Sequence, residues 1–100
     1  MYDMANLKKM KALKELAPDG MAAFQAFDAA AMKDGAIPKK FKELIALGVA
    51  FTTQCPYCIE VHTKAAKTAG CSEAEIAEAV VVAAALRAGG AITHGTHAIG

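Results

Sequence analysis

A chain of 100 residues with a formal net charge of +1 has no electrostatic signature of a protein that binds nucleic acid or an anionic membrane surface. Its length predicts one domain, residues 1–100. Hydrophobic residues make up 55% of the chain. A small monomer cannot easily bury that much apolar material, so we expect part of it to lie in contacts between subunits.

Apolar residues recur at helical spacing along most of the chain, and no segment alternates as a β-strand would. A first helix is predicted at residues 4–16, before a turn made by Pro18 and Gly20. A second follows at residues 21–32. The third, at residues 38–53, has Pro38 in its first turn and is apolar on all sides in its later part, which predicts a central, buried helix.

The second half of the chain predicts two more helices. One begins at about Cys55 and ends near residue 69, where Gly70 suits the position just after a helix. A capping box, SEAE at residues 72–75, starts the other, which we expect to end at Arg87 because two glycines follow it. Residues 89–100 would form a short helix or a frayed tail. The sequence therefore predicts a compact all-α bundle of five to six helices, with the third and fourth as a central buried hairpin.

The chain shows no sign of export or membrane insertion. Its N-terminus lacks the basic and then apolar segment of a secretory signal. The most apolar run, residues 79–86, is shorter than the ~20 residues that span a bilayer. We therefore expect a cytoplasmic protein with no membrane partner. In that reducing compartment, three cysteines indicate catalysis or metal binding rather than a disulfide framework.

The segment FTTQCPYCIEVHTKAA, residues 51–66, gathers two cysteines and a histidine: Cys55, Cys58 and His62. Pro56 suits the first position of a helix, which places Cys55 at the cap and Cys58 in the first turn. Free backbone N–H groups and the helix dipole lower the pKa of a thiol there. A spacing of three puts the two Cα atoms about 5 Å apart, within the range of a disulfide. His62 follows one turn later on the same face.

Glu43 is the candidate partner of this motif. If the third and fourth helices form an antiparallel hairpin that turns near Gln54, Glu43 lies at the edge of the buried helix, level with residues 62–66. A carboxylate beside an imidazole beside a thiol is a proton relay. Glu43 would orient and polarise His62, and His62 would take the proton from Cys58.

The spacing of these four residues resembles the alkylhydroperoxidase D-like branch of the carboxymuconolactone decarboxylase family. The likeness covers residues 36–97, including GAIPKKFKELIAL before the motif and KTAGCSEAEIAEAVVVAAALRAG after it. It implies an all-helical homo-oligomer, a trimer or a hexamer, that reduces hydroperoxides with electrons from a protein or small dithiol. It implies neither a cofactor nor a metal. The decarboxylase branch lacks the CxxC motif, which disfavours a lactone substrate.

The resemblance also implies a role for each residue. Cys58 matches the peroxidatic thiol, which a peroxide oxidises to a sulfenic acid. Cys55 matches the resolving thiol, which closes a disulfide with it before further oxidation. Glu43 and His62 match the relay. Cys71, which has no cysteine near it in the sequence, is predicted to remain a free, structural thiol.

Other interpretations compete with a peroxidase. The cysteines of the motif could be buried without chemistry, as small hydrophobic residues. Cys55 and Cys58 could bind Zn²⁺ together with His94 and His97, although the gap between the pairs is longer than in small zinc modules. The chain could also be a thiol–disulfide exchange protein without peroxidase activity, a small oligomeric partner of a larger redox enzyme, or a relative of the decarboxylases.

Overall fold

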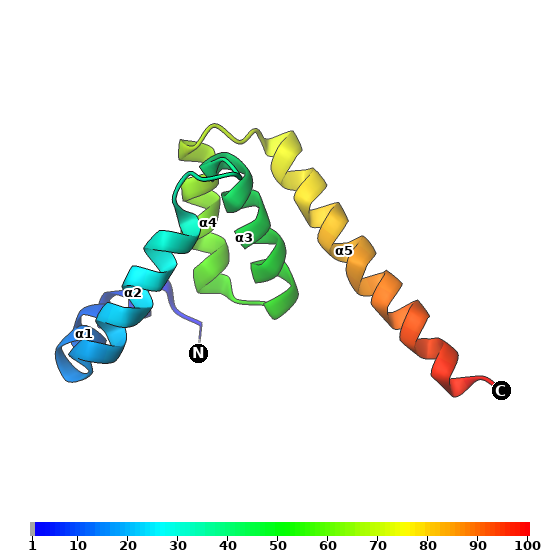
Figure 1. Ribbon diagram of the computed structural model, residues 1–100, viewed down its shortest axis with the longest axis horizontal. Coiled ribbons are helices and arrows are strands. Elements are labelled where there is room, and N and C mark those ends of the chain that lie inside the picture. Colours follow the sequence, from blue (N-terminus) through cyan, green and yellow to red (C-terminus); the bar gives the residue numbers. More distant parts are fainter. Residues whose placement is uncertain (1) are drawn as a thin grey trace.

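The computed structural model describes residues 2–100, and it is helical throughout (Figure 1). These residues form five α-helices and two 3₁₀ helices, and none of them forms a β-strand. In chain order the elements are η1 (Met4–Lys9), α1 (Met10–Leu16), α2 (Pro18–Met32), α3 (Lys39–Thr53), α4 (Pro56–Thr68), α5 (Glu73–Gly95) and η2 (Thr96–Ala98). The all-α prediction is confirmed.

The core lies in the hairpin of α3 and α4 (Figure 1). The buried residues come from these two helices and the turn after them: Glu43, Leu47, Ala50, Ala66 and Cys71. The partly buried Leu44, Phe51 and Ile76 pack around Leu47, Ala66 and Cys71. The predicted central hairpin is confirmed, and the burial of α3 follows from its apolar sequence after Lys42.

A tight turn between α3 and α4 sets the geometry of the CxxC motif. Gln54 closes α3 in the left-handed conformation, with φ of 56°. Cys55 is then extended at the N-cap of α4, and Pro56 is the first helical residue, as the sequence predicts. The far end of α4 also agrees with the prediction, because Gly70 follows it with φ of 95°.

The predicted end of α5 is wrong. The helix does not stop at Arg87; it continues through Gly89 and Gly90 to Gly95, so residues 89–95 belong to it and are not a separate tail. A glycine ends a helix when it adopts a positive φ, and neither Gly89 nor Gly90 does. Each costs about 1 kcal/mol relative to alanine. The helix nevertheless continues through them, because each further residue adds one backbone hydrogen bond to a helix that has already formed.

Three features of the first half also differ from the predictions. Residues 4–16 form a 3₁₀ helix followed by a short α-helix rather than one continuous helix. Pro18 does not form a turn but is the first residue of α2, where its missing N–H costs nothing. At the next helix, Pro38 is the N-cap residue and α3 starts at Lys39.

The fold is more open than the compact unit that the sequence predicts. Its radius of gyration is 16.6 Å, whereas a compact 100-residue domain has about 13 Å. Its accessible surface is 7308 Å², against about 5,400 Å² for a compact monomer of this mass. Figure 1 shows the reason: α1 and α2 lie to one side of the hairpin, and α5 extends away on the other. No residue of α1, α2 or α5 is fully buried.

Residues 73–98 form a helical stretch that is long and apolar enough to cross a membrane. Its mean hydropathy reaches 1.6 over 18 residues, and none of that window is buried. The prediction from the sequence considered only residues 79–86, so it underestimated the length of the apolar helical stretch. Length and composition are shared by membrane helices and by helices that pack against another subunit, so they do not separate the two.

The start of α5 is fixed by the predicted capping box. The Ser72 hydroxyl accepts a hydrogen bond from the Glu75 N–H (3.1 Å), and the Glu75 carboxylate accepts one from the Ser72 N–H (2.8 Å). The second Glu75 oxygen lies 3.0 Å from the Lys40 ammonium on α3. These contacts lower the pKa of Glu75, and the hydrogen bond from the Ser72 N–H has the largest effect. Because the pKa is lowered, these contacts stabilise the folded protein at pH values above the ordinary carboxyl pKa. This stabilisation is lost as the pH falls through the pKa that Glu75 has in the folded state.

We expect Ser72→Ala to lower the free energy of unfolding by about 1 kcal/mol, because it removes the acceptor for the Glu75 N–H. Urea denaturation followed by circular dichroism measures this change. Ser72→Asp keeps an acceptor at the N-cap and should retain wild-type stability. Equal stability of Ser72→Ala and wild type would show that the capping box does not hold α5.

Candidate active site

A hydrogen bond between a buried carboxylate and a histidine connects the two helices of the hairpin. The Glu43 Oε2 atom lies 2.7 Å from Nδ1 of His62, across the interface of α3 and α4. The proximity predicted from the turn position is therefore observed. Glu43 is not at an edge, however: only 2% of its side chain is exposed, against 23% for His62.

The buried carboxylate has a second partner, which the sequence did not single out. Lys39, one helical turn before Glu43, places its ammonium 3.2 Å from Oε1 of the carboxylate. Each oxygen of Glu43 thus has one partner, which satisfies a buried charge that would otherwise be costly. The signal was present in the sequence as a lysine and a glutamate four residues apart on a helix.

This contact fixes which nitrogen of His62 is the base. A carboxylate only accepts hydrogen bonds, so Nδ1 carries the proton that it donates to Glu43. Nε2 then holds the free lone pair. The arrangement orients the imidazole and stabilises the positive charge that it acquires when Nε2 takes a proton.

The two cysteines of the motif form a second pair. Their Sγ atoms lie 2.8 Å apart within a hydrogen bond, and the Cys58 N–H donates to the Cys55 sulfur at 3.3 Å. Both cysteines are free thiols. The side chain and then the N–H of Cys58 lower the pKa of Cys55. The bond to Cys55, followed by burial and the Cys55 charge, raises the pKa of Cys58 to about 11.

Cys55 is therefore the more acidic thiol of the pair, while the raised pKa keeps the proton on Cys58 at neutral pH. The position of both cysteines at a helix N-terminus predicts a lowered pKa for each of them. That expectation holds for Cys55 and fails for Cys58, because the two sulfurs interact more strongly with each other than Cys58 does with the dipole. Within residues 2–100, no hydrogen bond joins His62 directly to either sulfur.

The N-terminal segment lies beside the motif, which the sequence did not indicate. The Asn6 side-chain amide donates a hydrogen bond to the hydroxyl of Tyr57, the residue before Cys58, at 3.1 Å. The ring of Tyr2 meets the ring of Tyr57 edge-on, with centroids 6.0 Å apart. These contacts cover one side of the first turn of α4.

The zinc site considered from the sequence is not assembled. His94 and His97 lie at the C-terminal end of α5, with ring centroids 5.9 Å apart, and α5 packs on α3 but not on α4. Among residues 2–100, no three histidine, cysteine or acidic side chains gather where a metal could bind. Cys71 is buried and donates to the Lys40 carbonyl at 3.4 Å. Burial raises its pKa, in keeping with a structural thiol.

Comparison with known proteins gives the family. The family model for carboxymuconolactone decarboxylases matches residues 18–99, most of the chain. The chain belongs to the carboxymuconolactone decarboxylase family. The resemblance seen from the sequence is thereby confirmed at the level of the family, and it extends into α2, before the residues on which it was first based.

Relatives in this family share both sequence and fold. A protein from Paracoccus denitrificans, known as uncharacterized protein 4 in the cox locus, is 42% identical over 102 residues, which cover 99% of this chain and 92% of the relative. A carboxymuconolactone decarboxylase family protein from Legionella pneumophila superposes with a TM-score of 0.77 at 32% identity, over 80% of this chain and 71% of the other. A Methanobacterium thermoautotrophicum protein does so with a TM-score of 0.82 at 31% identity, over 88% and 99%.

Proposed function

We propose that this member of the carboxymuconolactone decarboxylase family is a thiol-dependent peroxidase that reduces alkyl hydroperoxides with its Cys55–Cys58 pair. The observation that carries the proposal is the presence, on one helix hairpin, of two sulfurs 2.8 Å apart and a Glu43–His62 dyad whose histidine follows Cys58 by four residues on α4. A thiol, a second thiol within bonding reach and an oriented base are the groups that this reaction requires.

The first step is the attack of Cys58 on the peroxide. With its pKa raised to about 11, Cys58 is a thiol at neutral pH and needs a base. Nε2 of His62 takes the proton through a bridging water or the peroxide itself, with Glu43 stabilising the imidazolium. The sulfur bonds to the terminal peroxide oxygen as the O–O bond breaks. The alkoxide then takes the proton from His62 and leaves as an alcohol, and Cys58 becomes a sulfenic acid.

Cys55 completes the reaction. Its lowered pKa makes Cys55 the more acidic thiol of the pair, so it more readily supplies the thiolate that attacks the Cys58 sulfenic acid beside it. The S–S bond forms, the S–O bond breaks, and hydroxide leaves and is protonated to water. The disulfide has consumed one peroxide and two electrons. A protein or small dithiol returns those electrons by thiol–disulfide exchange. We propose a cytoplasmic location because such reductants are kept reduced there.

Reduced protein mixed with cumene hydroperoxide under stopped flow tests this proposal. We expect the peroxide to be consumed in proportion to protein, with a Cys55–Cys58 disulfide and a free Cys71 found by peptide mapping. Cys71→Ser should behave as wild type. If peroxide is not consumed faster than by the Cys55→Ser, Cys58→Ser double variant, the peroxidase is excluded. Reduction of a model disulfide by the same sample would then assign thiol–disulfide exchange.

A further inference from the structure

Lys39 brings a surface cation to the buried carboxylate of the hairpin. Its ammonium lies 3.2 Å from Oε1 of Glu43, and it also donates to the carbonyl of Met32, the last residue of α2, at 3.4 Å. The lysine side chain is 46% exposed, whereas that of Glu43 is 2% exposed. The cation therefore reaches water, and the carboxylate that it pairs with does not.

We propose that Lys39 is a positioning residue of the candidate active site, because its charge balances that of Glu43 and so keeps His62 as a neutral base. The effect of Lys39 on turnover rests on the proposed peroxidase. Its effect on His62 does not, since that effect depends only on the charges of the three side chains.

A count of charges gives the reason. Lys39, Glu43 and His62 sum to zero only while His62 is neutral. A buried carboxylate without a cation is costly, and the ammonium removes that cost before His62 binds any proton. Without the ammonium, His62 is the remaining group that can supply a positive charge, so it would hold a proton at rest. An imidazolium has no free lone pair and cannot accept the proton of Cys58.

The same contact fixes the orientation of the carboxylate. Lys39 holds Oε1 from the preceding turn of α3, and this leaves Oε2 directed at Nδ1 of His62, 2.7 Å away. The backbone N–H of Lys39 donates to the carboxylate of Asp34 at 2.6 Å, which anchors the first residue of α3 to the loop after α2. Lys39 therefore holds the dyad from a fixed point.

No other charged group takes the place of Lys39. Within residues 2–100, Glu43 forms ion pairs with Lys39 and His62 alone. Cys71, in the turn after α4, interacts with the charge of Glu43, but it supplies no positive charge, and burial is the main cause of its raised pKa. Charged groups on the elements packed around the hairpin form no ion pair with the dyad: Lys8 and Lys9 on η1, Asp34 after α2, Lys40 on α3, Lys64 on α4 and Glu75 on α5.

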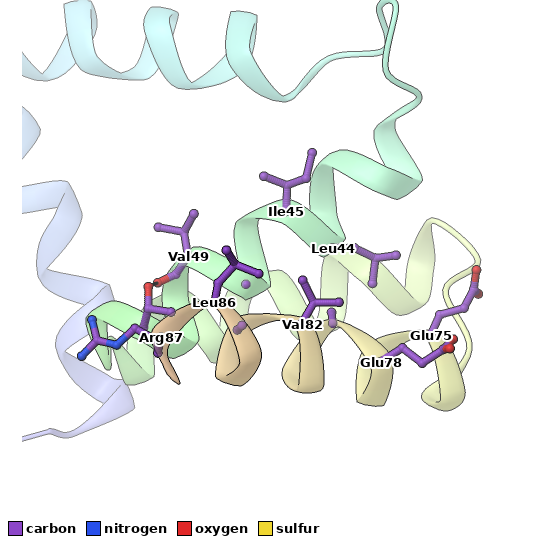
Figure 2. Close-up of a pocket in the computed structure, with 12 residues that line it drawn as sticks. Leu44, Ile45, Val49, Glu75, Glu78, Val82, Leu86 and Arg87 are labelled. Carbon is purple, nitrogen blue, oxygen red and sulfur yellow. Dashed lines mark hydrogen bonds between the residues drawn. The ribbon is translucent and has the colours of Figure 1, made fainter. Parts of the chain in front are cut away.

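Neighbouring lysines of α3 provide matched controls for Lys39→Met, which removes the charge, and Lys39→Arg, which keeps it. Lys40 is 35% exposed and pairs at 3.0 Å with Glu75, which Figure 2 shows at the start of α5, at one end of the groove between α3 and α5. Lys42 donates to the carbonyl of Lys33 at 2.7 Å and so contacts the loop after α2 without touching Glu43. Circular dichroism of Lys40→Met, Lys42→Met and both Lys39 variants checks that the helices are intact.

The first measurement needs no peroxide. Long-range ¹H–¹⁵N spectra of the reduced protein distinguish an imidazole with its proton on Nδ1 from an imidazolium, and a His62→Gln sample identifies the His62 signals. In a pH titration, the imidazolium of Lys39→Met should lose its proton at a pH about one unit or more above that of wild type. Lys39→Arg, Lys40→Met and Lys42→Met should follow wild type.

The second measurement is peroxide consumption as a function of pH. A shift of one unit means about tenfold less neutral imidazole at a pH below the transition. Turnover of Lys39→Met should therefore fall by about that factor and recover as the pH rises, while Lys39→Arg keeps the wild-type profile.

The proposal is wrong if Lys39→Met titrates as wild type does. It is also wrong if Lys39→Arg shifts as far as Lys39→Met, because charge is then not the cause, or if Lys40→Met shifts His62 equally, because any nearby lysine then has the same effect. A shifted titration of Lys39→Met, in a protein whose wild type consumes no peroxide, supports the role of Lys39 and rejects the peroxidase.

Discussion

Peroxide reduction should be lost completely in Cys58→Ser, whereas Cys55→Ser should react once and accumulate a sulfenic acid at Cys58. The reason is that Cys58 supplies the attacking sulfur and Cys55 only resolves the product. Stopped-flow peroxide consumption and a sulfenic-acid probe with peptide mapping measure the two outcomes. Cys71→Ser makes the same substitution at the third cysteine and should change neither.

The same variants carry a pH test. In wild type, the hydrogen bond and charge of Cys55 raise the pKa of Cys58 to about 11. A raised thiol pKa means that less thiolate is present at a given pH, so removing its causes must increase the thiolate. We therefore measure the first step of the reaction in two proteins that both carry His62→Gln, one with Cys55 and one with Cys55→Ser. The protein with Cys55→Ser should reach its half-maximal rate at a lower pH. Labelling of Cys55 by the probe in Cys58→Ser, at the wild-type rate, would reverse the two roles.

The charge of Glu43 should matter almost as much. Glu43→Gln keeps the shape of the side chain and removes the carboxylate that holds Nδ1 of His62 at 2.7 Å. Turnover at neutral pH should fall by roughly 10²–10⁴-fold, the effect of losing a general base. The rate should recover as the pH rises, because hydroxide then deprotonates Cys58 without help. Steady-state peroxide consumption as a function of pH measures both effects.

A matched change separates catalysis from stability. Glu60→Gln alters a carboxylate on the exposed side of α4, where it pairs with Lys64 at 3.0 Å, and should leave turnover unchanged. His62→Gln should lose as much activity as Glu43→Gln, and the double variant little more, because the two residues act as a unit. Full activity of a folded Glu43→Gln would remove Glu43 from the mechanism.

Local signals made much of the fold predictable. The capping box at Ser72, the proline after Cys55 and the glycine at position 70 each act through neighbours a few residues away. The register of the hairpin followed from one turn, because helices rise by a fixed 1.5 Å per residue on both sides of it. For that reason Glu43 could be placed beside His62 from the sequence, although they are 19 positions apart.

Other features depended on atoms that a sequence does not position. Whether Gly89 and Gly90 end α5 is decided by their φ angles, and the sequence does not show that they remain helical. The location of the thiol proton depends on how close the two sulfurs lie, since their mutual hydrogen bond outweighs the helix dipole. Lys39 was visible as a residue four positions before Glu43, but its role required knowing that Glu43 is buried.

By itself, the sequence determined the helices, the hairpin and the four residues of the candidate site, because helical periodicity, caps and turns are short-range properties. The tertiary structure decided which thiol is the more acidic, how Glu43 is satisfied, and that α5 packs on α3 while much of its apolar surface stays exposed. Composition had indicated surplus apolar surface. Only the packing of α5 on α3 showed where that surface lies, because burial depends on contacts between residues distant in the chain.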